Sequence, residues 1–247
     1  MPSEVQDDAR TRRITCMTTI VVPTLNEVDN IGLLIERIYG VLDRESTAVI
    51  VVDDNSVDGT HEVVRSAAER YPNVQLIVRR HERGLGSAVR LGASQARDGP
   101  TVVMDADLSH DPCHIPSMLS RLAEGFDVVV GSRYIEGGSV IGWPGSRVAV
   151  SRVATLMARI LFGLSVRDPM SGFVASRDPH LLAHGFRHGD YKFLLELIVR
   201  NRGIRVAEVP IVFRDRRRGK SKFGGRTVVR YLSLLVHLFV ARVLGRE

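Results

Sequence analysis

Short runs of β-branched residues recur along the first half of the chain, and an amphipathic stretch follows each one. The runs begin about 26 to 29 residues apart. Near-continuous valine and isoleucine is typical of strands buried on both faces, as in parallel sheets. The five runs are Thr19–Val22, Ala48–Val52, Val74–Val78, Thr101–Met104 and Asp127–Val130. This spacing predicts an α/β fold with a doubly wound, mostly parallel sheet flanked by helices.

Helical patterns fit between these runs. Ile31–Leu42, for example, keeps its isoleucine and leucine residues on one stripe, and Asp58 is placed to cap the helix that begins at Thr60. Right-handed crossovers would put such helices on both faces of the sheet. The predicted helices are Ile31–Leu42, Thr60–Tyr71, Leu85–Ala96 and Ile115–Glu124.

The alternation of strand and helix patterns ends after Ser132. Tyr134–Ser146 is rich in glycine, so we expect a loop there. Val206–Phe213 is typical of a final strand, and Pro210 favours an edge position because proline cannot donate to the ladder. Helices are predicted at Arg147–Phe162, Tyr191–Arg202 and Thr227–Leu244.

The charge is concentrated in one stretch. Phe213–Arg226 holds seven basic residues and one acid, and the rest of the chain has equal numbers of each. A polyanionic partner is therefore expected to meet the protein at this stretch. The stretch has no series of aromatic residues on which bases could stack, so we do not expect a nucleic acid. With 44% hydrophobic and 25% charged residues, the composition excludes a mainly disordered chain or a multi-span membrane protein.

The two cysteines and the N-terminus indicate a cytoplasmic location. Cys16 and Cys113 are too few for a disulfide framework and show no metal-binding spacing, as is common in reducing compartments. The first 16 residues mix acids and bases without an apolar core, which is not the pattern of a signal peptide. We expect residues 1–17 to form a flexible tail.

Acidic residues follow two of the predicted strands. Asp53 and Asp54 come directly after the second strand, and Asp105 and Asp107 after the fourth. Ligands of open α/β sheets bind beyond the carboxyl ends of strands. Because residues i and i+2 of an extended segment point the same way, Asp105 and Asp107 could converge on one Mg²⁺ or Mn²⁺ ion. Alternatively, acids at these positions cap the following helices; two pairs at neighbouring strands favour a site.

The neighbouring pair formed by His110 and Asp111 could suggest another metal site. Adjacent residues on a loop are more often solvated, and we expect that here.

At this point the chain resembles a known family. The motifs that carry the resemblance to family-2 glycosyltransferases of GT-A fold are Pro23–Glu27, Val51–Thr60, Gly84–Gly86, Asp105–His110 and Gly131–Tyr134. Later motifs are similar to those of the polyprenyl-phosphate (dolichol-phosphate) mannose synthases, namely Asp168–Phe173, Tyr191–Phe193 with Glu196, and Arg216–Lys222. Together they span about Thr19 to Gly225. The resemblance implies a glycosyltransferase domain over residues 18–226.

The resemblance also implies which residues bind the donor nucleotide-sugar. The matching positions are Pro23, Leu25, Glu27, Val51, Asp53, Asp105, Ala106 and Asp107, together with Arg216 and Lys222 on a loop that closes over the donor. Leu25 stands where the family usually has tyrosine.

Metal and acceptor residues follow from the same resemblance. Asp105 and Asp107 fall on the metal and diphosphate motif, and Ser109 stands where glutamine often supplies a third metal contact. Arg133 matches a phosphate-binding position. Arg147 and Ser151 match positions that meet the lipid phosphate. The catalytic residues implied are Asp105, Asp107 and Arg133.

The implied activity is an inverting transfer of a hexose to a polyprenyl or dolichyl phosphate. The sugar expected is mannose from GDP-mannose, with Mg²⁺ or Mn²⁺ and basic side chains stabilising the leaving nucleoside diphosphate. Two alternatives stay open. One is transfer of glucose or N-acetylglucosamine from a UDP-sugar, and the other is a non-catalytic module that binds sugar nucleotides or nucleic acid.

The C-terminal segment 227–247 predicts how the protein reaches a lipid. Tyr231–Val240 is apolar except for Ser233 and His237, but a span needs about 20 apolar residues. Flanking arginines favour an amphipathic helix lying in the membrane interface. We therefore expect a peripheral protein on the cytosolic face of a membrane. The alternatives are a helix packed on the sheet, or one leading to a membrane segment of a partner, such as a small anchoring subunit, or of a longer chain.

Overall fold

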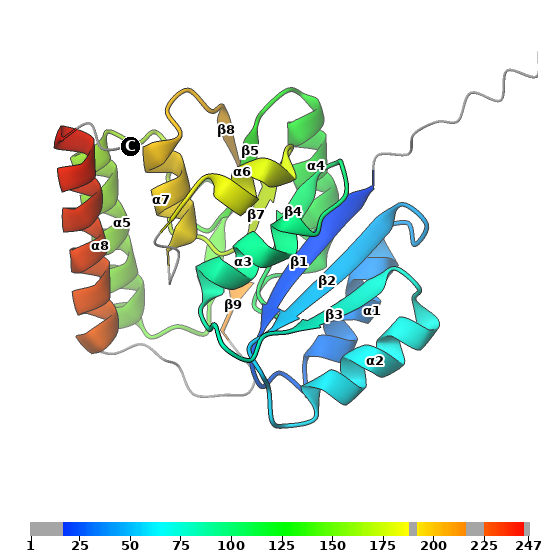
Figure 1. The fold of residues 1–247 in the computed structure, drawn as a ribbon. Helices are drawn as coiled ribbons and strands as arrows, with labels where there is room; N and C mark the ends of the chain where they lie inside the picture. The colour runs from blue at the N-terminus through cyan, green and yellow to red at the C-terminus, as the bar shows by residue number, and fades with distance from the viewer. Residues whose placement is uncertain (1–16, 188–191, 216–224, 245–247) are drawn as a thin grey trace, which may run out of the picture.

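A seven-stranded sheet forms the centre of the molecule in the computed structural model, which describes residues 17–187, 192–215 and 225–244 (Figure 1). The strand order is β3-β2-β1-β4-β7-β5-β8, and every neighbouring pair is parallel except those of β7. The strands are β1 Thr18–Thr24, β2 Thr47–Asp53, β3 Val74–Val78, β4 Thr101–Val103, β5 Val128–Ser132, β7 Val174–Ser176 and β8 Val206–Pro210. The predicted mostly parallel sheet is confirmed.

Helices cover both faces of this sheet, because alternate strand residues face opposite sides. Ile20 and Val22 of β1 belong to the core beneath α1, α2 and α4, whereas Val21 belongs to the core beneath α3, α6 and α7. The helices are α1 Ile31–Val41, α2 Thr60–Arg70, α3 Leu85–Ser94, α4 Ile115–Ala123, α6 Pro179–His184 and α7 Phe193–Arg200, with a short 3-10 turn, η1, at Pro112–His114. The doubly wound arrangement is confirmed, and the helix bounds lie close to those predicted.

Two strands depart from the prediction. The predicted strand Val206–Phe213 divides at Ile211 into β8, at the edge of the main sheet, and β9 Val212–Arg214. β9 pairs in parallel with β6 Ser139–Ile141, which lies within the segment predicted to be loop. The buried Ile211 makes the transition, since its N–H donates to Ser132 O and its C=O accepts from Ser139 N, both at 3.0 Å. The edge position indicated by Pro210 is confirmed.

The antiparallel strand β7 was not predicted. It is only three residues long and lies between β4 and β5, so its neighbours are supplied by distant parts of the chain. The N-cap of α2 also differs from the prediction. Gly59 takes that position with a φ of 96°, and Asp58 instead accepts from the backbone N–H groups of Thr60 and Val28.

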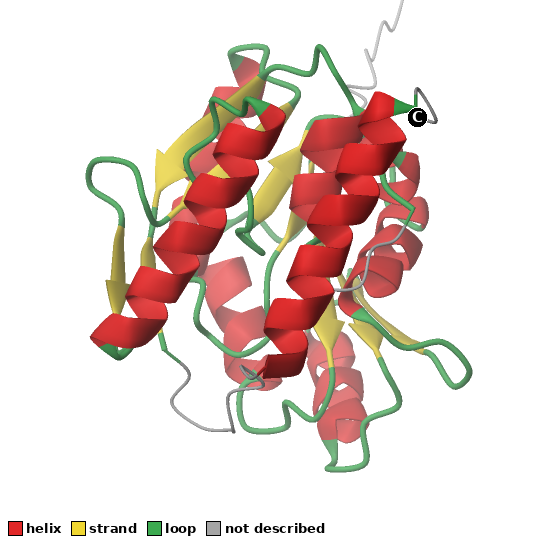
Figure 2. Ribbon diagram, turned by 90° about the vertical axis from the view of Figure 1, so that its left-hand side faces the viewer, coloured by secondary structure: helices red, strands yellow, loops and turns green. Residues whose placement is uncertain are grey.

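Two long helices lie side by side at one end of the molecule, away from the sheet (Figures 1 and 2). These are α5 Gly145–Phe162 and α8 Gly225–Val243. Tyr231 donates to Ala154 O at 2.6 Å and Arg242 donates to Phe162 O at 2.8 Å, so the two helices run in the same direction. The predicted C-terminal helix is confirmed, and it packs on α5 and α7 rather than on the sheet. Within the described residues, no helix is both long and apolar enough to cross a bilayer.

Candidate active site

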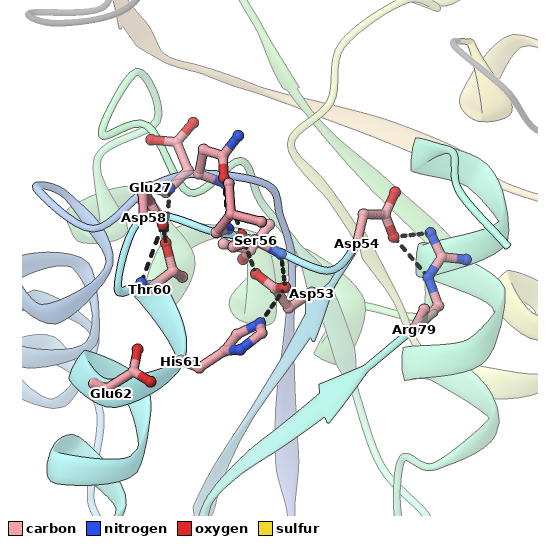
Figure 3. Close-up of polar contacts among 12 residues, drawn as sticks. Glu27, Asp53, Asp54, Ser56, Asp58, Thr60, His61, Glu62 and Arg79 are labelled. Atoms are coloured by element: carbon pink, nitrogen blue, oxygen red, sulfur yellow. Dashed lines mark hydrogen bonds and ion pairs between the residues drawn. The ribbon is translucent and has the colours of Figure 1, made fainter. Parts of the chain in front are cut away.

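The loop after β2 is organised by the carboxylate of Asp53, which is fully buried (Figure 3). It accepts from the backbone N–H of Ser56 at 2.7 Å and from the Ser56 hydroxyl at 2.6 Å. His61 Nε2 lies 2.6 Å from the same carboxylate. Asp53 therefore fixes the loop at which the family resemblance places the donor nucleotide, and His61 is a member of this network that the sequence did not single out.

The loop after β1 is fastened to the loop after β2. Ser56 Oγ accepts from the backbone of Asn26 at 2.7 Å, and Thr60 Oγ1 accepts from that of Glu27 at 3.0 Å. Pro23 lies beside Val52 at the ends of the paired strands. The predicted donor residues Pro23 and Glu27 are thus brought together with Asp53 at the carboxyl ends of β1 and β2.

The other predicted donor positions nearby differ in exposure. Leu25 is half-buried on the same loop. The side chain of Val51 belongs to the hydrophobic core and has no exposed surface. The Val51 side chain is therefore not accessible to a ligand, and only its main chain could contact one.

Asp54 serves a structural ion pair rather than a ligand site. Its carboxylate accepts from Arg79 Nε at 2.7 Å and from the backbone N–H of Gly84 at 2.9 Å (Figure 3). Arg79 also donates to Ser87 Oγ and to Gly84 O. This network holds the N-terminus of α3 against the end of β2. The alternative that Asp54 caps the helix following β2 is wrong, because α2 has Gly59 as its N-cap without a side-chain cap.

The metal motif lies on a turn and not on an extended segment. Ala106 and Asp107 form the turn that follows β4, and Leu108 has a φ of 61°. The expectation that strand alternation brings Asp105 and Asp107 together is therefore wrong. Both carboxylates nevertheless act on the buried His110. Burial lowers the pKa of His110, and the negative charges of the two aspartates oppose that shift.

The residues of this turn fit a hard divalent cation. Asp105 keeps about a third of its side chain exposed, and Asp107 accepts from the backbone N–H of Ser109 at 3.0 Å. Ser109 Oγ is buried and has no hydrogen-bond partner among the described residues. A bound cation could be coordinated by this unsatisfied oxygen. Carboxylate and hydroxyl oxygens are ligands that Mg²⁺ and Mn²⁺ accept. Among the described residues, no group of three or more His, Cys, Asp or Glu could hold a metal.

Close packing fixes the position of Asp105. A Cβ on Gly172 would lie 3.2 and 3.3 Å from its two carboxylate oxygens, so a larger residue there would have to displace the Asp105 carboxylate slightly. His110 Nδ1 accepts from the backbone N–H of Asp105 at 3.3 Å, and its ring stacks on Phe173 with centroids 5.1 Å apart. The expectation that His110 is solvated is therefore wrong. Asp111 instead caps η1 by accepting from the backbone N–H of Cys113.

Arg133 is held by a buried acid. Its guanidinium donates to both oxygens of Asp168, at 2.7 and 2.8 Å, and Asp168 has no exposed surface. The same guanidinium carbon lies between 5.1 and 5.6 Å from the ring centroids of Tyr134, Trp143 and Phe213.

A lysine adds positive charge to this region. Burial, together with the positive charge of Arg133, lowers the pKa of Lys192 to about 8, while the charges of Asp168 and Asp105 act in the opposite direction. Its ammonium donates to Met170 O at 3.2 Å. The sequence motif contained Lys192, but nothing in the spacing indicated that it lies near Asp105.

The predicted acceptor residues gather at the start of α5. Arg147 lies 3.9 Å above the ring of Trp143 and donates to Asp215 at 3.2 Å. One helical turn later, Ser151 Oγ accepts from the Tyr134 hydroxyl at 2.7 Å. Through Tyr134, the Arg147–Ser151 face adjoins Arg133, so the three predicted phosphate-binding residues lie in one neighbourhood. Sequence reasoning missed Trp143 and Asp215.

Several predicted residues fall outside the described part of the chain. These are the N-terminal tail up to residue 16, Tyr191, Arg216 and Lys222.

The mostly parallel sheet, with the loops after β1 and β2 and the turn after β4 at the carboxyl ends of its strands, is the arrangement expected of a glycosyltransferase of the GT-A type. The chain belongs to glycosyl transferase family 2, whose model matches residues 19–181. The resemblance and fold expected from the sequence are therefore confirmed.

Curated relatives align over most of the chain. A dolichol-phosphate mannosyltransferase of Pyrococcus furiosus is 37% identical over 89% of this chain and 63% of its own length. One of Mycosarcoma maydis is 37% identical over 90% of this chain and 78% of its own length. The chain thus spans less than two thirds of the archaeal relative.

Solved structures support the fold. The glucosyl-3-phosphoglycerate synthase of Mycobacterium tuberculosis, in complex with Mn²⁺, UDP and glucosyl-3-phosphoglycerate, has a TM-score of 0.66 and 20% identity, covering 94% of this chain and 80% of its own. The same protein in complex with Mg²⁺ and UDP has a TM-score of 0.65, 20% identity and coverage of 94% and 79%.

Proposed function

We propose that this protein transfers mannose from GDP-mannose to a polyprenyl phosphate, using Mg²⁺ or Mn²⁺. The observation that carries this is the neighbourhood of an oxygen-rich turn, Asp105 to Ser109, and an arginine-bearing acceptor region at the start of α5. The relatives that align over nearly nine tenths of the chain are named dolichol-phosphate mannosyltransferases, which supports both sugar and acceptor. The neighbouring structures that contain Mn²⁺ or Mg²⁺ support a divalent cation.

The reaction is a single displacement. An oxygen of the acceptor phosphate attacks the anomeric carbon of the sugar, a C–O bond forms, and the bond to the nucleoside diphosphate breaks on the opposite side. The anomeric centre inverts, so an α-linked donor gives a β-linked product. Because the acceptor phosphate is already an anion, the step needs no Ser-His-Asp or Cys-His arrangement. When bound, the metal would neutralise charge that develops on the leaving diphosphate.

The chain's own residues hold the two substrates. Asp105, Asp107 and Ser109 would hold the metal. Arg147 and Ser151 would meet the acceptor phosphate, with Arg133 behind them. Preorganised charges of this kind stabilise a transition state without having to move during the reaction.

The donor side of the site consists of the two fastened loops. Pro23, Leu25, Glu27 and Asp53 place the main chain at which the nucleotide would bind. Arg216 and Lys222 would complete the donor site over the diphosphate, as the family motif implies.

A donor panel tests this function directly. GDP-mannose, UDP-glucose and UDP-N-acetylglucosamine are each incubated with polyprenyl phosphate and Mg²⁺ or Mn²⁺, and the lipid product is measured. We expect transfer from GDP-mannose alone, lost in EDTA. Preferred transfer from a UDP-sugar would establish the alternative donor, and absence of transfer from every donor would leave a binding module.

We further propose that the α5–α8 surface meets the cytosolic face of a membrane. These two helices carry strongly exposed apolar residues. The exposed fraction is 74% for Ile160, 67% for Val229 and 63% for Val236. Arg152 of α5 and Arg230 of α8 are also exposed and could reach anionic headgroups. Figure 2 shows α5 and α8 together at the front, on one side of the molecule. A small membrane-anchoring subunit is the competing occupant of this surface.

Substitution tests this surface better than deletion, because Tyr231, Leu235 and Leu238 of α8 are buried and deletion would expose their core partners. The double variant Ile160→Ser, Val236→Ser should bind anionic liposomes more weakly than the wild type. Leu33→Ser on α1, also exposed, is the matched control. High salt should weaken wild-type binding. Equal liposome binding by all three proteins would exclude the membrane proposal and favour an anchoring subunit.

A further inference from the structure

Arg147, a predicted ligand of the acceptor phosphate, already faces an anion from its own chain. Its Nη1 lies 3.2 and 3.4 Å from the two carboxylate oxygens of Asp215. On its other side, the guanidinium carbon lies 3.9 Å from the ring centroid of Trp143. Arg147 is therefore held by an aromatic ring and by a carboxylate.

The two holders differ in how firmly they bind Arg147. Charge-assisted N–H···O bonds of full strength are about 2.7 to 2.9 Å long, so both distances to Asp215 are long. The side chains of Arg147 and Asp215 keep 22% and 33% of their surface exposed, and pairs open to water contribute little. The ring contact needs no exchange of partner when an anion arrives, because a cation can sit on an aromatic face while it donates to an anion. The carboxylate is thus the exchangeable partner.

Asp215 is fixed where it can compete for Arg147. Its backbone N–H donates to Ile141 O at 2.8 Å, at the end of the β6–β9 pair. Gly142 makes room for it, since a Cβ there would lie 3.0 Å from the Asp215 Cβ. The backbone and Cβ of Asp215 are therefore placed by the fold, within reach of Arg147.

The ring of Trp143 is also fixed. It meets Phe213 edge to face with centroids 5.3 Å apart. Its indole Nε1–H is buried and has no hydrogen-bond partner among the described residues. A buried donor without an acceptor is costly, so this group would gain from any oxygen acceptor that reached it.

We propose that Asp215 is an internal competitor of the acceptor phosphate. Its carboxylate pairs with Arg147 when the acceptor is absent, and a phosphate monoester displaces it while Trp143 keeps the guanidinium in place. The inference rests on the proposed function only in that the acceptor is a phosphate monoester. If the internal pair is formed in some of the molecules, the apparent Kd for the phosphate rises as the fraction of molecules without the pair falls.

Trp143 is the only tryptophan of the chain, so its fluorescence reports on this site directly. The full chain, without donor, is titrated with a short, water-soluble polyprenyl phosphate, with the parent alcohol and with inorganic phosphate. We expect a saturable change with the phosphate ester and none with the alcohol. A response to inorganic phosphate would show that the headgroup alone exchanges with Asp215.

The deciding variant is Asp215→Asn. Removing an exposed paired charge should lower the Kd for the phosphate ester about two- to five-fold, with an equal fall in the acceptor KM. Asp215→Glu should restore the wild-type value, which a merely structural role would not predict. Glu36→Gln on α1 removes a carboxylate paired with Arg70 and changes the net charge equally, so it is the matched control. In an Arg147→Ala background the benefit of Asp215→Asn should vanish.

An unchanged or higher Kd in Asp215→Asn, or an equal fall in Glu36→Gln, would overturn the proposal. Failure of the proposed function can be distinguished from failure of the competitor proposal. A wild-type protein that binds the phosphate ester with Asp215-dependent affinity but transfers no sugar contradicts only the function. Sugar transfer with Asp215-independent binding contradicts only the competitor.

Discussion

The Arg133 guanidinium and the Asp168 carboxylate form a two-point salt bridge inside the protein, with N–O distances of 2.7 and 2.8 Å. The backbone N–H of Arg133 donates to the same carboxylate at 3.1 Å. Asp168 is itself fixed, since its backbone N–H donates to Glu208 at 3.0 Å. Arg133 therefore anchors the end of β5, in addition to the phosphate-binding role proposed for it.

This pair predicts different outcomes for two arginines that the sequence placed in one role. Arg133→Ala leaves a buried carboxylate without its partner and should lower the free energy of unfolding by about 3 to 5 kcal/mol. Arg147→Ala breaks a partly exposed pair and should cost less than about 1 kcal/mol while raising the acceptor KM. Urea unfolding of the two variants checks the first effect and acceptor kinetics the second. Equal stability of the two variants would contradict the anchoring role.

Asp107 should be tested with asparagine before alanine. Asparagine can still accept from the Ser109 backbone N–H but lacks the charge that would hold the cation. We expect Asp107→Asn to unfold at the wild-type urea concentration and to lose about 10² to 10³ in rate, the usual loss for a preorganised charge. Asp107→Ala should show the same loss of rate with an additional stability loss of about 1 kcal/mol. Full activity of either variant, or of the wild type in excess EDTA, would exclude the metal role.

Ser109→Ala separates metal binding from stability. The Ser109 hydroxyl is buried without a hydrogen-bond partner among the described residues, so removing it should leave the free energy of unfolding unchanged or raise it by about 1 kcal/mol. If the hydroxyl meets the cation, the variant should bind Mn²⁺ more weakly in a calorimetric titration without any transfer reaction. Asp58→Ala, which alters another loop carboxylate, should leave Mn²⁺ affinity unchanged. Wild-type affinity in Ser109→Ala would place water at the third position.

The contact between α5 and α8 gives a pH prediction. Burial raises the pKa of Tyr231 from its ordinary value of 10.0 to about 12. A raised pKa means that the folded protein holds this proton while the unfolded chain releases it, so the associated stability is fully present below pH 10 and is lost between pH 10 and 12. Tyr231→Phe lacks this loss.

Urea unfolding of the wild type and Tyr231→Phe across this range measures the effect. Near pH 8 the wild type should be more stable by about 1 kcal/mol, because its hydroxyl donates to Ala154 O. That advantage should shrink and then reverse as the pH rises, since each pKa unit corresponds to about 1.4 kcal/mol. A difference that stays constant up to pH 12 would mean that the hydroxyl is not buried against α5.

The sequence alone predicted the parts of the fold that depend on local pattern. Runs such as Ala48–Val52 gave β2 almost to the residue, because a strand buried on both faces needs apolar side chains at consecutive positions. The edge position of β8 followed from Pro210, which has no N–H for a further neighbour. Strand β7 escaped prediction because its three residues are held by β4 and β5, which lie far away in the sequence.

Motif order determined the family, whereas only the tertiary structure decided what several site residues do. Asp53 and Asp54 are adjacent in sequence and equally acidic, yet one fixes its own loop through Ser56 and His61 and the other pairs with Arg79. The pairings of Arg133 with Asp168 and of Arg147 with Asp215 join residues 35 and 68 positions apart. The physical reason is that a residue's type sets which partners it can accept, while the distance to those partners depends on how the strands and helices pack.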